Sequence, residues 1–581
     1  MNPDAAAALA SLADTRTTLL SGIELPSAGA PSPARAAFAA APATTEEVDA
    51  AAAPVALADE PVFDRAAADD IQGNIVPGFN KDHQHFAFVR FGTIEGARAW
   101  LRGLAPRLTT MREVLDFRTE FRAQRLRLGV REPGLTATWT AVALAHPAIE
   151  SLAGADDAAR FETSFRQGLA ERSAYLGDPA DADHQGHRSN WVVGGPDDDV
   201  DALVIVAADD PADLDAAVDE LLAAAADHDV TQVFGQRGAT LPGNLQGHEH
   251  FGFKDGISQP GVRGRRDTAP DAHLTPRYLA AEDPHASLFA KPGQPLVWPG
   301  QFLLGEPRQH HQDPTVPGPP ATGFPDWARH GSYLVCRRLD QDVVGFWELA
   351  ASAAAALGTT PVAFASMLVG RWPSGAPLLR SPLADDAALA GDEFANNHFL
   401  FDDDTRASVL EPIPGYDGDA HPAAAADLFG AVCPHVAHIR KVNPRDSGTD
   451  FGAAGDTFLR LMLRRGIPYG EPIAGVADAP PELVEAERGL LFAAYMSSIE
   501  DQFEFVTRRW ANSPTQPNVG GLDPIIGQRD RHGDRARHIE LPVADGTTTT
   551  VELPTDLVTP TGGGYFFAPP ISAVAGVLAG D

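Results

Sequence analysis

Three short segments of this sequence carry side chains whose types and spacing are suited to chemistry. The first is Gly252–Pro260 (GFKDGISQP), in which Asp255 stands between glycines and shortly before a proline. Glycine and proline favour a tight loop over a regular element, so this loop can direct the Asp255 carboxylate into a pocket. The alternative is an ordinary turn aspartate that binds its own backbone. The other two segments decide between these readings.

The second segment, Cys433–Arg445, places two histidines three residues apart. On a helix, His435 and His438 would share one face, which brings a zinc site to mind. A third ligand and an adjacent glutamate of the HExxH type are missing, which disfavours a zinc hydrolase. One histidine can instead be the axial ligand of a haem, which requires one imidazole in an apolar cavity and an acceptor for its other nitrogen. Two purely structural histidines are the remaining alternative.

The third segment, 456–470, ends an apolar run with Arg464 and Arg465, just before a glycine and a proline. Basic residues in the last turn of a helix commonly interact with the helix dipole, which gives the pair a structural explanation. The aspartate, the histidines and the arginines thus each have a structural explanation, but three such explanations in one chain are less convincing than one.

Composition excludes several classes of protein. The chain has 581 residues, of which 44% are hydrophobic, and this length corresponds to about two to four domain-sized units. Its formal charge of -34 repels nucleic acid and anionic membrane surfaces, so we expect neither as a partner. No run of about 18 apolar residues predicts a membrane-spanning helix. The two cysteines, Cys336 and Cys433, exclude a disulfide framework and any multi-cysteine metal site within one chain.

The N-terminus gives an expectation about location. Residues 1–20 lack a basic leader followed by an apolar block, and no twin arginine precedes such a block. We therefore expect a cytoplasmic protein, and secretion remains open.

Strand patterns followed by helix patterns recur along the chain and must position the three segments. The pairs are 85–91 with 94–105, 202–207 with 211–226, 331–339 with 342–357, and 489–495 with 500–510. Two such pairs in each half predict a duplicated α+β plan, in which each half makes an antiparallel sheet with helices on one face.

Proline, glycine and alanine mark the segments outside these units. Residues 1–65 are predicted to form a flexible Ala/Pro-rich extension, and 266–325 a Pro/Gly-rich connector that wraps a surface. The two domains are then 66–265, which carries the Asp255 loop, and 326–581, which carries the other two segments.

The three segments, taken in order, resemble a known set of signatures. GFKDGISQP, CPHVAHIRKVNPR and LRRGIPYG are similar to those of the dye-decolorising peroxidase family of haem proteins. DIQGNIVPGF, GLLFAAYMSSIEDQFEFV and GLDPIIGQ resemble the same family, so the resemblance extends from about Asp69 to the C-terminus. It implies two tandem ferredoxin-like domains of the dimeric α+β barrel type, with the haem held mainly by 326–581.

Carried over position by position, the resemblance implies a residue set on each side of the haem. Asp255 takes the place of the distal acid–base residue, and Arg464 takes that of the distal arginine, with Arg465 as its competitor. His438 takes the place of the iron ligand, and His435 is the second choice.

The resemblance also places further residues around the haem. They are Gly256 and Ile257 in the distal loop, and Leu490 and Phe492 in the distal pocket. Asp523 is the expected carboxylate partner of the proximal histidine, and Glu500 and Asp501 are the alternatives. Tyr469, Tyr495 or Trp510 could relay electrons to the surface, although buried aromatic residues more often serve packing.

The function implied is that of a peroxidase with one haem b per chain. Hydrogen peroxide would oxidise bulky aromatic molecules, such as dyes, phenolics and lignin-like compounds, in one-electron steps. Release of iron from haem and a haem carrier or sensor without turnover are the alternatives, because fold and ligand alone do not establish activity. The physiological substrate, and whether the chain forms a homo-oligomer, are not readable from the sequence.

An aspartate in the role of proton shuttle predicts the pH dependence of turnover. A carboxyl with an ordinary pKa of about 3.9 stays ionised, and therefore basic, into mild acid. Peroxidase turnover is thus expected to be highest on the acidic side of neutral. Steady-state rates measured from about pH 3 to 8 check this, and a steady rise toward alkaline pH would contradict it.

Overall fold

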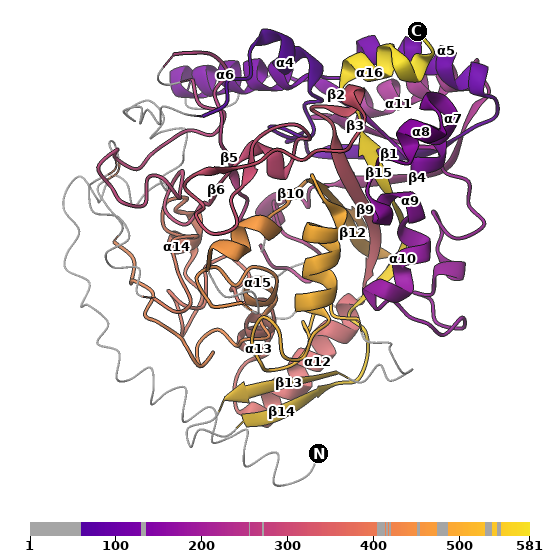
Figure 1. Cartoon of the computed structure of the whole chain (residues 1–581). Helices are drawn as coiled ribbons and strands as arrows, with labels where there is room; N and C mark the ends of the chain where they lie inside the picture. The colour runs from indigo at the N-terminus through magenta and orange to yellow at the C-terminus, as the bar shows by residue number, and fades with distance from the viewer. Residues whose placement is uncertain are drawn as a thin grey trace.

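One large, nine-stranded antiparallel sheet runs through the protein (Figure 1). The computed structural model describes residues 60–128, 135–254, 256–269, 272–403, 413, 416, 420–449, 454–472, 486–528, 537–542 and 548–581. Most of the predicted N-terminal extension, and Asp255 itself, lie outside these ranges.

The N-terminal half of the sheet has the strand order β2-β3-β1-β4. Its strands are β1 (His83–Phe91), β2 (Thr138–Leu144), β3 (Ala202–Ala208) and β4 (Val230–Ala239). Helix α5 (Ile94–Leu104) follows β1, and α11 (Pro211–Ala226) follows β3. Both helices begin at a side-chain cap, since Thr93 and Asp210 accept backbone N–H groups of the first turn. Both predicted strand–helix pairs are confirmed.

The C-terminal half repeats this plan in the order β10/β11-β12-β9-β15. Its strands are β9 (Ser332–Gln341), β10 (Leu463–Arg464), β11 (Ile467–Gly470), β12 (Arg488–Met496) and β15 (Val558–Ala568). Helix α12 (Val343–Leu357), capped by Asp342, follows β9. Within each half, the strands can be numbered by their order along the chain, with β10 and β11 counted as one position. Both halves then place their strands across the sheet in the order second, third, first, fourth. This is the order of a ferredoxin-like unit, so two such units are confirmed.

The two halves join edge to edge, and the far edges of the sheet approach each other. Strand β15 pairs with β2 through Phe567 and Leu144. At the other ends, a Cβ on Gly238 of β4 would lie 2.5 Å from Cγ2 of Ile467 and 2.9 Å from the carbonyl oxygen of Pro468 in β11. A glycine is required there because β4 and β11 are so close. The sheet therefore curves toward a barrel. The domain limits expected from the sequence, at residues 265 and 326, stay a prediction.

The central strands of the sheet are buried on both faces, and β3, the most deeply buried, is entirely apolar, whereas the edge strand β4 is partly exposed and more polar. In β1, Ala87 and Val89 pack in one core with α5 and α11, whereas Phe86 and Phe88 pack in a second core on the opposite face. The second core includes Val297, Phe302 and Leu303 of the Pro/Gly-rich connector. The connector thus covers the face that these helices leave open.

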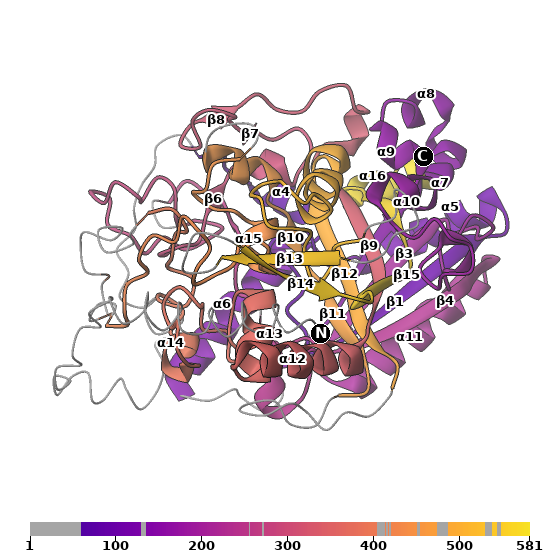
Figure 2. The same cartoon turned by 90° about the horizontal axis from the view of Figure 1, so that it is seen from below.

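Shorter elements surround the sheet. The helices are α4 (Arg65–Asp70), α6 (Met111–Leu128), α7 (His146–Ala153), α8 (Ala155–Ala158), α9 (Thr163–Gln167), α10 (Leu169–Leu176), α13 (Pro361–Val369), α14 (Ala387–Gly391), α15 (His438–Val442) and α16 (Ile571–Ala575). The paired strands are β5 (Gly261–Val262), β6 (Leu296–Val297), β7 (Arg308–Gln309), β8 (Pro317–Gly318), β13 (Arg537–Pro542) and β14 (Thr548–Leu553). Figures 1 and 2 both show α7 to α10 gathered on one side, apart from α12 and α13.

The helices include no clear membrane span. Within the described ranges, no single helix is long and apolar enough to cross a membrane. Helices α12 and α13, taken together, are long and apolar enough by length and composition only, and the pair is bent by 110°.

Two local interpretations need correction. The segment before Arg464 does not end as a helix: a 3-10 helix, η7 (Ala454–Arg460), stops earlier, and Arg464 lies in β10, where it pairs with Ala494 of β12. The helix expected over 500–510 consists of two π-helical segments, η8 (Ile499–Glu504) and η9 (Val506–Ala511). Such widened turns are common near functional sites.

Candidate active site

A cavity of about 1200 Å³ brings the three motif segments together. Its walls include His438 of α15, Arg464 of β10, and Gly256 and Ser258 of the loop that follows Asp255. Much of the remaining wall is apolar, with contributions from Ile439, Val442, Leu461, Met462, Leu490, Phe492, Phe503, Val506, Ile525 and Ile526. Of the predicted pocket residues, Leu490 and Phe492 do line the cavity. A cavity of this size and character can hold a large, flat organic group.

His438 is the first residue of α15, and Asp523 fixes its ring. Its Nδ1 lies 2.8 Å from Oδ2 of Asp523, whose side chain is fully buried. The other oxygen, Oδ1, accepts the backbone N–H groups of Ile525 and Ile526 at 2.8 and 3.0 Å. Burial raises the pKa of Asp523, but the charge and hydrogen bond of His438, with these N–H groups, hold it below its usual value. An Nδ1–H donated to this carboxylate leaves the lone pair on Nε2.

His435 has a different environment. Its Nδ1 faces the carbonyl oxygen of Val519 at 3.3 Å, and its Nε2 faces that of Leu428 at 3.1 Å. The ring is not part of the cavity wall. The two histidines therefore do not converge on one point. Within the described ranges, no group of three or more His, Cys, Asp and Glu side chains could hold a metal ion.

Arg464 and Arg465, although adjacent, point to different structures. Nη2 of Arg464 donates to the carbonyl oxygen of Ser258 at 2.7 Å, so Arg464 joins β10 to the Asp255 loop at the cavity. Arg465 donates to the carbonyl oxygens of Asn74, Ile75 and Pro77 at 3.0–3.1 Å, which ties down the turn before β1. Burial, with the charges of Arg118 and Arg464 in support, lowers the pKa of Arg465 to about 9. Both arginines line the cavity, but Arg465 is held by backbone carbonyls of the N-terminal half, whereas Arg464 contacts the Asp255 loop.

The loop around Asp255 is held from both sides, although Asp255 lies outside the described residues. The backbone N–H of Lys254 donates to Pro373 O at 3.2 Å. Gln259 and the backbone of Arg464 exchange two long hydrogen bonds of 3.4 Å. A Cβ on Gly256 would meet nothing within 4 Å, so the chain leaves open space at that position. Ile257, predicted to touch the haem, instead packs its Cδ1 toward Gly375 and does not line the cavity.

Two family models match the chain and together span well over half of it. The model described as DyP dimeric alpha+beta barrel domain matches residues 70–242. The model described as Dyp-type peroxidase, C-terminal, matches residues 309–518.

Proteins named as dye peroxidases are similar in sequence to this chain over most of its length. It is 31% identical to dye-decolorizing peroxidase msp1 of Mycetinis scorodonius over 529 residues, which cover 88% of this chain and 87% of the relative. The chain belongs to the dye-decolorising peroxidase family. It is also 31% identical over 526 residues to the multifunctional dye peroxidase DyP2 of an Amycolatopsis species, covering 87% and 94% of the two chains.

Solved structures of dye-decolorising peroxidases have the same fold. An ancestral D-type enzyme superposes with a TM-score of 0.68 at 29% identity, and the enzyme of Auricularia auricula-judae with 0.62 at 26%. Each match covers 88% of this chain and 99% of the other. The α+β fold class predicted from the sequence is therefore confirmed, and the chain is a peroxidase.

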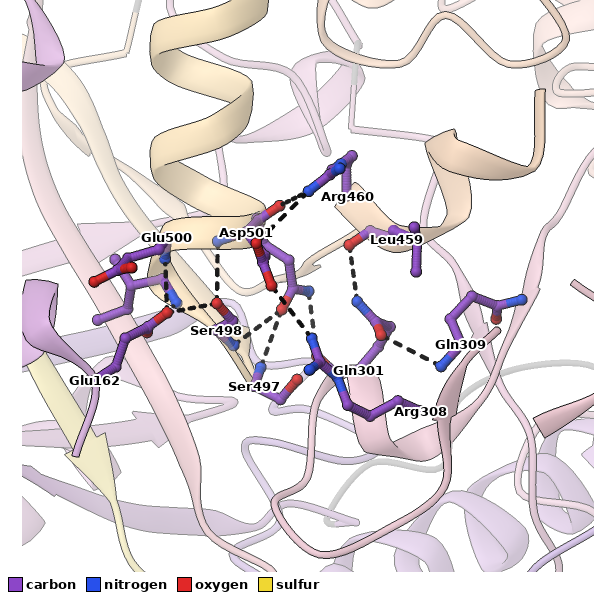
Figure 3. Close-up of polar contacts among 12 residues, drawn as sticks. Glu162, Gln301, Arg308, Gln309, Leu459, Arg460, Ser497, Ser498, Glu500 and Asp501 are labelled. Atoms are coloured by element: carbon purple, nitrogen blue, oxygen red, sulfur yellow. Dashed lines mark hydrogen bonds and ion pairs between the residues drawn. The ribbon is translucent and has the colours of Figure 1, made fainter. Parts of the chain in front are cut away.

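Asp523 lies against His438, whereas the two alternative carboxylates, Glu500 and Asp501, lie elsewhere. Figure 3 shows that Glu500 and Asp501 face a separate polar cluster at the start of η8. Oε1 of Glu500 accepts the backbone N–H of Ser164 at 2.9 Å. Asp501 lies 3.6 Å from Arg308 and 4.0 Å from Arg460. Asp523 is thus the partner, as the resemblance implied, and the two alternatives are wrong.

The same cluster joins the two halves of the peroxidase through Glu162 (Figure 3). Its carboxyl accepts from Oγ of Ser498 at 2.5 Å and from the backbone N–H groups of Ile499 and Glu500 at 2.7 and 3.2 Å, which caps η8. Burial outweighs these hydrogen bonds and raises the pKa of Glu162 to about 7.

This raised pKa gives the stability of the peroxidase a pH dependence. The folded state keeps a proton on Glu162 that the unfolded state releases near pH 4.5, so the free energy of unfolding falls as pH rises from about 4.5 to 7. Glu162→Gln is expected to remove up to about 3 kcal/mol of this fall. Denaturant unfolding at pH 5 and pH 8 measures it, with Glu150→Gln on an exposed helix face as the control. Equal pH dependence in both variants would contradict the assignment.

Two arginines that sequence reasoning missed share one amide at the cavity wall. Nη2 of Arg371 and Nη2 of Arg445 both donate to Oδ1 of Asn397, at 3.1 and 2.6 Å. Burial, and the neighbouring charge of Arg371, lower the pKa of Arg445 to about 9. Arg445 ends one of the quoted segments and could have been singled out, whereas Arg371 stands in no motif. The two guanidiniums also donate to backbone carbonyls of Gly375, Asn396 and Phe399, so they brace this part of the cavity wall.

The three predicted relay residues are themselves buried, with Tyr469, Tyr495 and Trp510 at most 2% exposed. The hydroxyl of Tyr469 donates to Asp340, and that of Tyr495 accepts from Asn74 at 3.1 Å. None of the three rings reaches the surface, so electron relay through them stays a prediction.

Proposed function

We propose that this peroxidase binds one haem b in the 1200 Å³ cavity and uses hydrogen peroxide to oxidise bulky aromatic molecules in one-electron steps. Dyes, phenolics and lignin-like compounds are the substrate class, in line with the dyes named for its relatives. The observation that carries the proposal is His438, held through Nδ1 by the buried Asp523 at the wall of a cavity that also presents apolar side chains such as Ile439 and Phe492.

The residues of the cavity fit a haem. His438 would bind the iron through Nε2, because Asp523 already accepts Nδ1–H. The apolar side chains of the wall suit the faces of a porphyrin. Bound haem would supply an iron that takes up the oxidising equivalents of peroxide and passes them on singly.

The protein's own contribution to the reaction is proton transfer and charge stabilisation. Asp255 would take a proton from one oxygen of hydrogen peroxide and return it to the other. The Arg464 guanidinium would stabilise the negative charge that grows on the departing oxygen. Its hydrogen bond to Ser258, three residues beyond Asp255, supports a common location for the two groups.

Substitution of Arg464 tests this proposal. Arg464→Leu is expected to lower kcat for peroxide-dependent dye oxidation by about 10²–10³-fold, the usual effect of removing one charge-stabilising donor. The haem spectrum should be retained, because His438 is untouched. Steady-state kinetics with a bulky dye measure the effect.

The alternatives are tested by the same variant. A haem carrier or an iron-release protein has no use for a distal guanidinium and would show no dye oxidation even in the unchanged protein, whereas unchanged turnover in Arg464→Leu would remove Arg464 from the mechanism. Arg464→Lys is the matched control: it keeps the charge but loses the planar donor geometry, and intermediate activity is expected.

A further inference from the structure

Helix α6 brings two phenylalanines and two arginines to the cavity wall. Phe117, Arg118, Phe121 and Arg122 are all half-buried. Residues 117 and 121, like 118 and 122, are one helical turn apart, so the four side chains lie on one side of α6. The rings of Phe117 and Phe121 are nearly parallel, at 19°, and their centroids are 6.3 Å apart. We call these four residues the α6 site.

Arg118 has donors that the protein does not use. Its Nη2 donates to the carbonyl oxygen of Gly78 at 3.0 Å. Within the described ranges, its Nε and Nη1 donate to no group, and no carboxylate forms an ion pair with it. Neither nitrogen is fully buried, so both can donate to a ligand in the cavity. Arg465, in contrast, donates to backbone carbonyls through all three of its nitrogens.

Gly78 lies between Arg118 and Arg465. Arg118 donates to its carbonyl oxygen, and a side chain at this position would collide with the guanidinium of Arg465. Arg465 directly follows Arg464, and all three arginines line the cavity. A row of guanidiniums thus leads from the α6 site to Arg464.

Carboxylates in the adjoining wall do not neutralise Arg118. Asp209 is paired with Lys81 at 2.5 Å, and Asp82 forms no ion pair with an arginine in the described part of the chain. Burial, with the charge of Arg122 adding to it, lowers the pKa of Arg118 to about 10, so its guanidinium stays charged at neutral and acidic pH. The chain as a whole carries a formal charge of -34, which makes this local group of cations a distinct feature.

We propose that the α6 site binds the anionic group of an aromatic substrate, a carboxylate or a sulfonate. Arg118 would donate hydrogen bonds to two oxygens of that group, the arrangement that a planar guanidinium favours. The substrate ring would pack against the half-buried Phe121. The inference rests on the proposed oxidation of aromatic molecules, and it adds that the peroxidase selects anionic ones over uncharged ones of the same shape.

A structural role for Arg118 is the competing explanation, because its hydrogen bond to Gly78 braces the turn before β1. A residue with that role alone gives the protein no preference for an anionic ligand. Two probes of nearly equal shape, guaiacol-4-sulfonate and guaiacol-4-sulfonamide, separate the two roles because only the first is anionic. Their affinities for the haem-loaded protein are measured by calorimetry without peroxide, so that no turnover takes place.

Salt gives the first test, which needs no variant. Sulfonate binding at local cations is expected to weaken when sodium chloride rises from about 0.02 to about 0.5 M, because salt screens charges. The affinity for the sulfonamide should change little. The net negative charge of the chain alone predicts the reverse, namely tighter sulfonate binding in salt. Such a reversal, or an equal salt dependence of the two probes, would overturn the inference.

Substitution gives the second test. Arg118→Gln is expected to reduce the preference for the sulfonate over the sulfonamide by about tenfold, the usual effect of losing one hydrogen bond to a charged group. Arg118→Lys should retain part of the preference, and Phe121→Leu should weaken the binding of both probes alike. Arg112→Gln is the matched control and should keep the preference, because Arg112 is on the same helix but pairs with Asp69 and does not line the cavity. An unchanged preference in Arg118→Gln, or an equal loss in Arg112→Gln, would show that the inference is wrong.

The α6 site and the proposed function can fail separately. If the haem-loaded protein binds the sulfonate through Arg118 but oxidises no dye, the proposed function is wrong and the α6 site stands. If dye oxidation is observed but the binding of neither probe depends on Arg118, the inference is wrong and the peroxidase proposal stands.

Discussion

Replacing His438 with glycine is expected to reduce peroxide-dependent dye oxidation to background. Substituting a mere partner of a metal-bound histidine typically costs about 10–100-fold in affinity or activity, and removal of the ligand itself costs more. The Soret spectrum of the haem-loaded protein should be lost or strongly altered. Imidazole added to the solution should restore part of the activity, because Asp523 remains buried beside the gap and can accept its N–H.

His435→Gly is the matched control for this experiment. It removes the other histidine of the same segment, whose nitrogens face the carbonyls of Leu428 and Val519. This variant should keep the haem spectrum and the activity of the unchanged protein, and added imidazole should not raise its activity. The opposite outcome, with the spectrum lost in His435→Gly and retained in His438→Gly, would transfer the ligand role to His435.

The elements that position the site were readable from local patterns. Strand patterns predicted β1 and β9, and helix patterns placed the starts of α5, α11 and α12 within one residue. The choice between His435 and His438 was not readable from their spacing. It depends on which ring meets Asp523, 85 residues away in the chain, and only folding brings those groups together.

The errors have the same origin. The sequence allowed Arg464 to be a dipole partner at the end of a helix. In the structure it lies in the two-residue strand β10, which exists only because β12 pairs with it. Ile257 follows Asp255 in sequence and was placed on the haem, yet it turns toward Gly375 of a distant segment. Arg371 carries no motif at all, and its place at the cavity comes from hydrogen bonds to Gly375 and Asn396. Tertiary contacts, not local propensity, decided each case.

Asp255→Asn is expected to lower kcat/KM for hydrogen peroxide by about 10²–10⁴-fold, the usual contribution of a positioned acid–base group. Asparagine has the size of aspartate but cannot take up a proton, so it removes the shuttle while filling the same space. The haem spectrum should be unchanged, since His438 and Asp523 are intact. Asp255→Glu, which keeps a carboxylate on a longer side chain, is the matched control and should retain more activity.

The pH profile of Asp255→Asn makes this prediction specific to proton transfer. The hydroperoxide anion has already lost the proton that Asp255 would remove, and its concentration rises with pH. The rate of the Asn variant should therefore climb steadily toward alkaline pH, whereas the unchanged protein works best on the acidic side of neutral. A variant whose rate is low but follows the original pH profile would show that Asp255 orders the loop between Gly252 and Gly256 and does not move the proton.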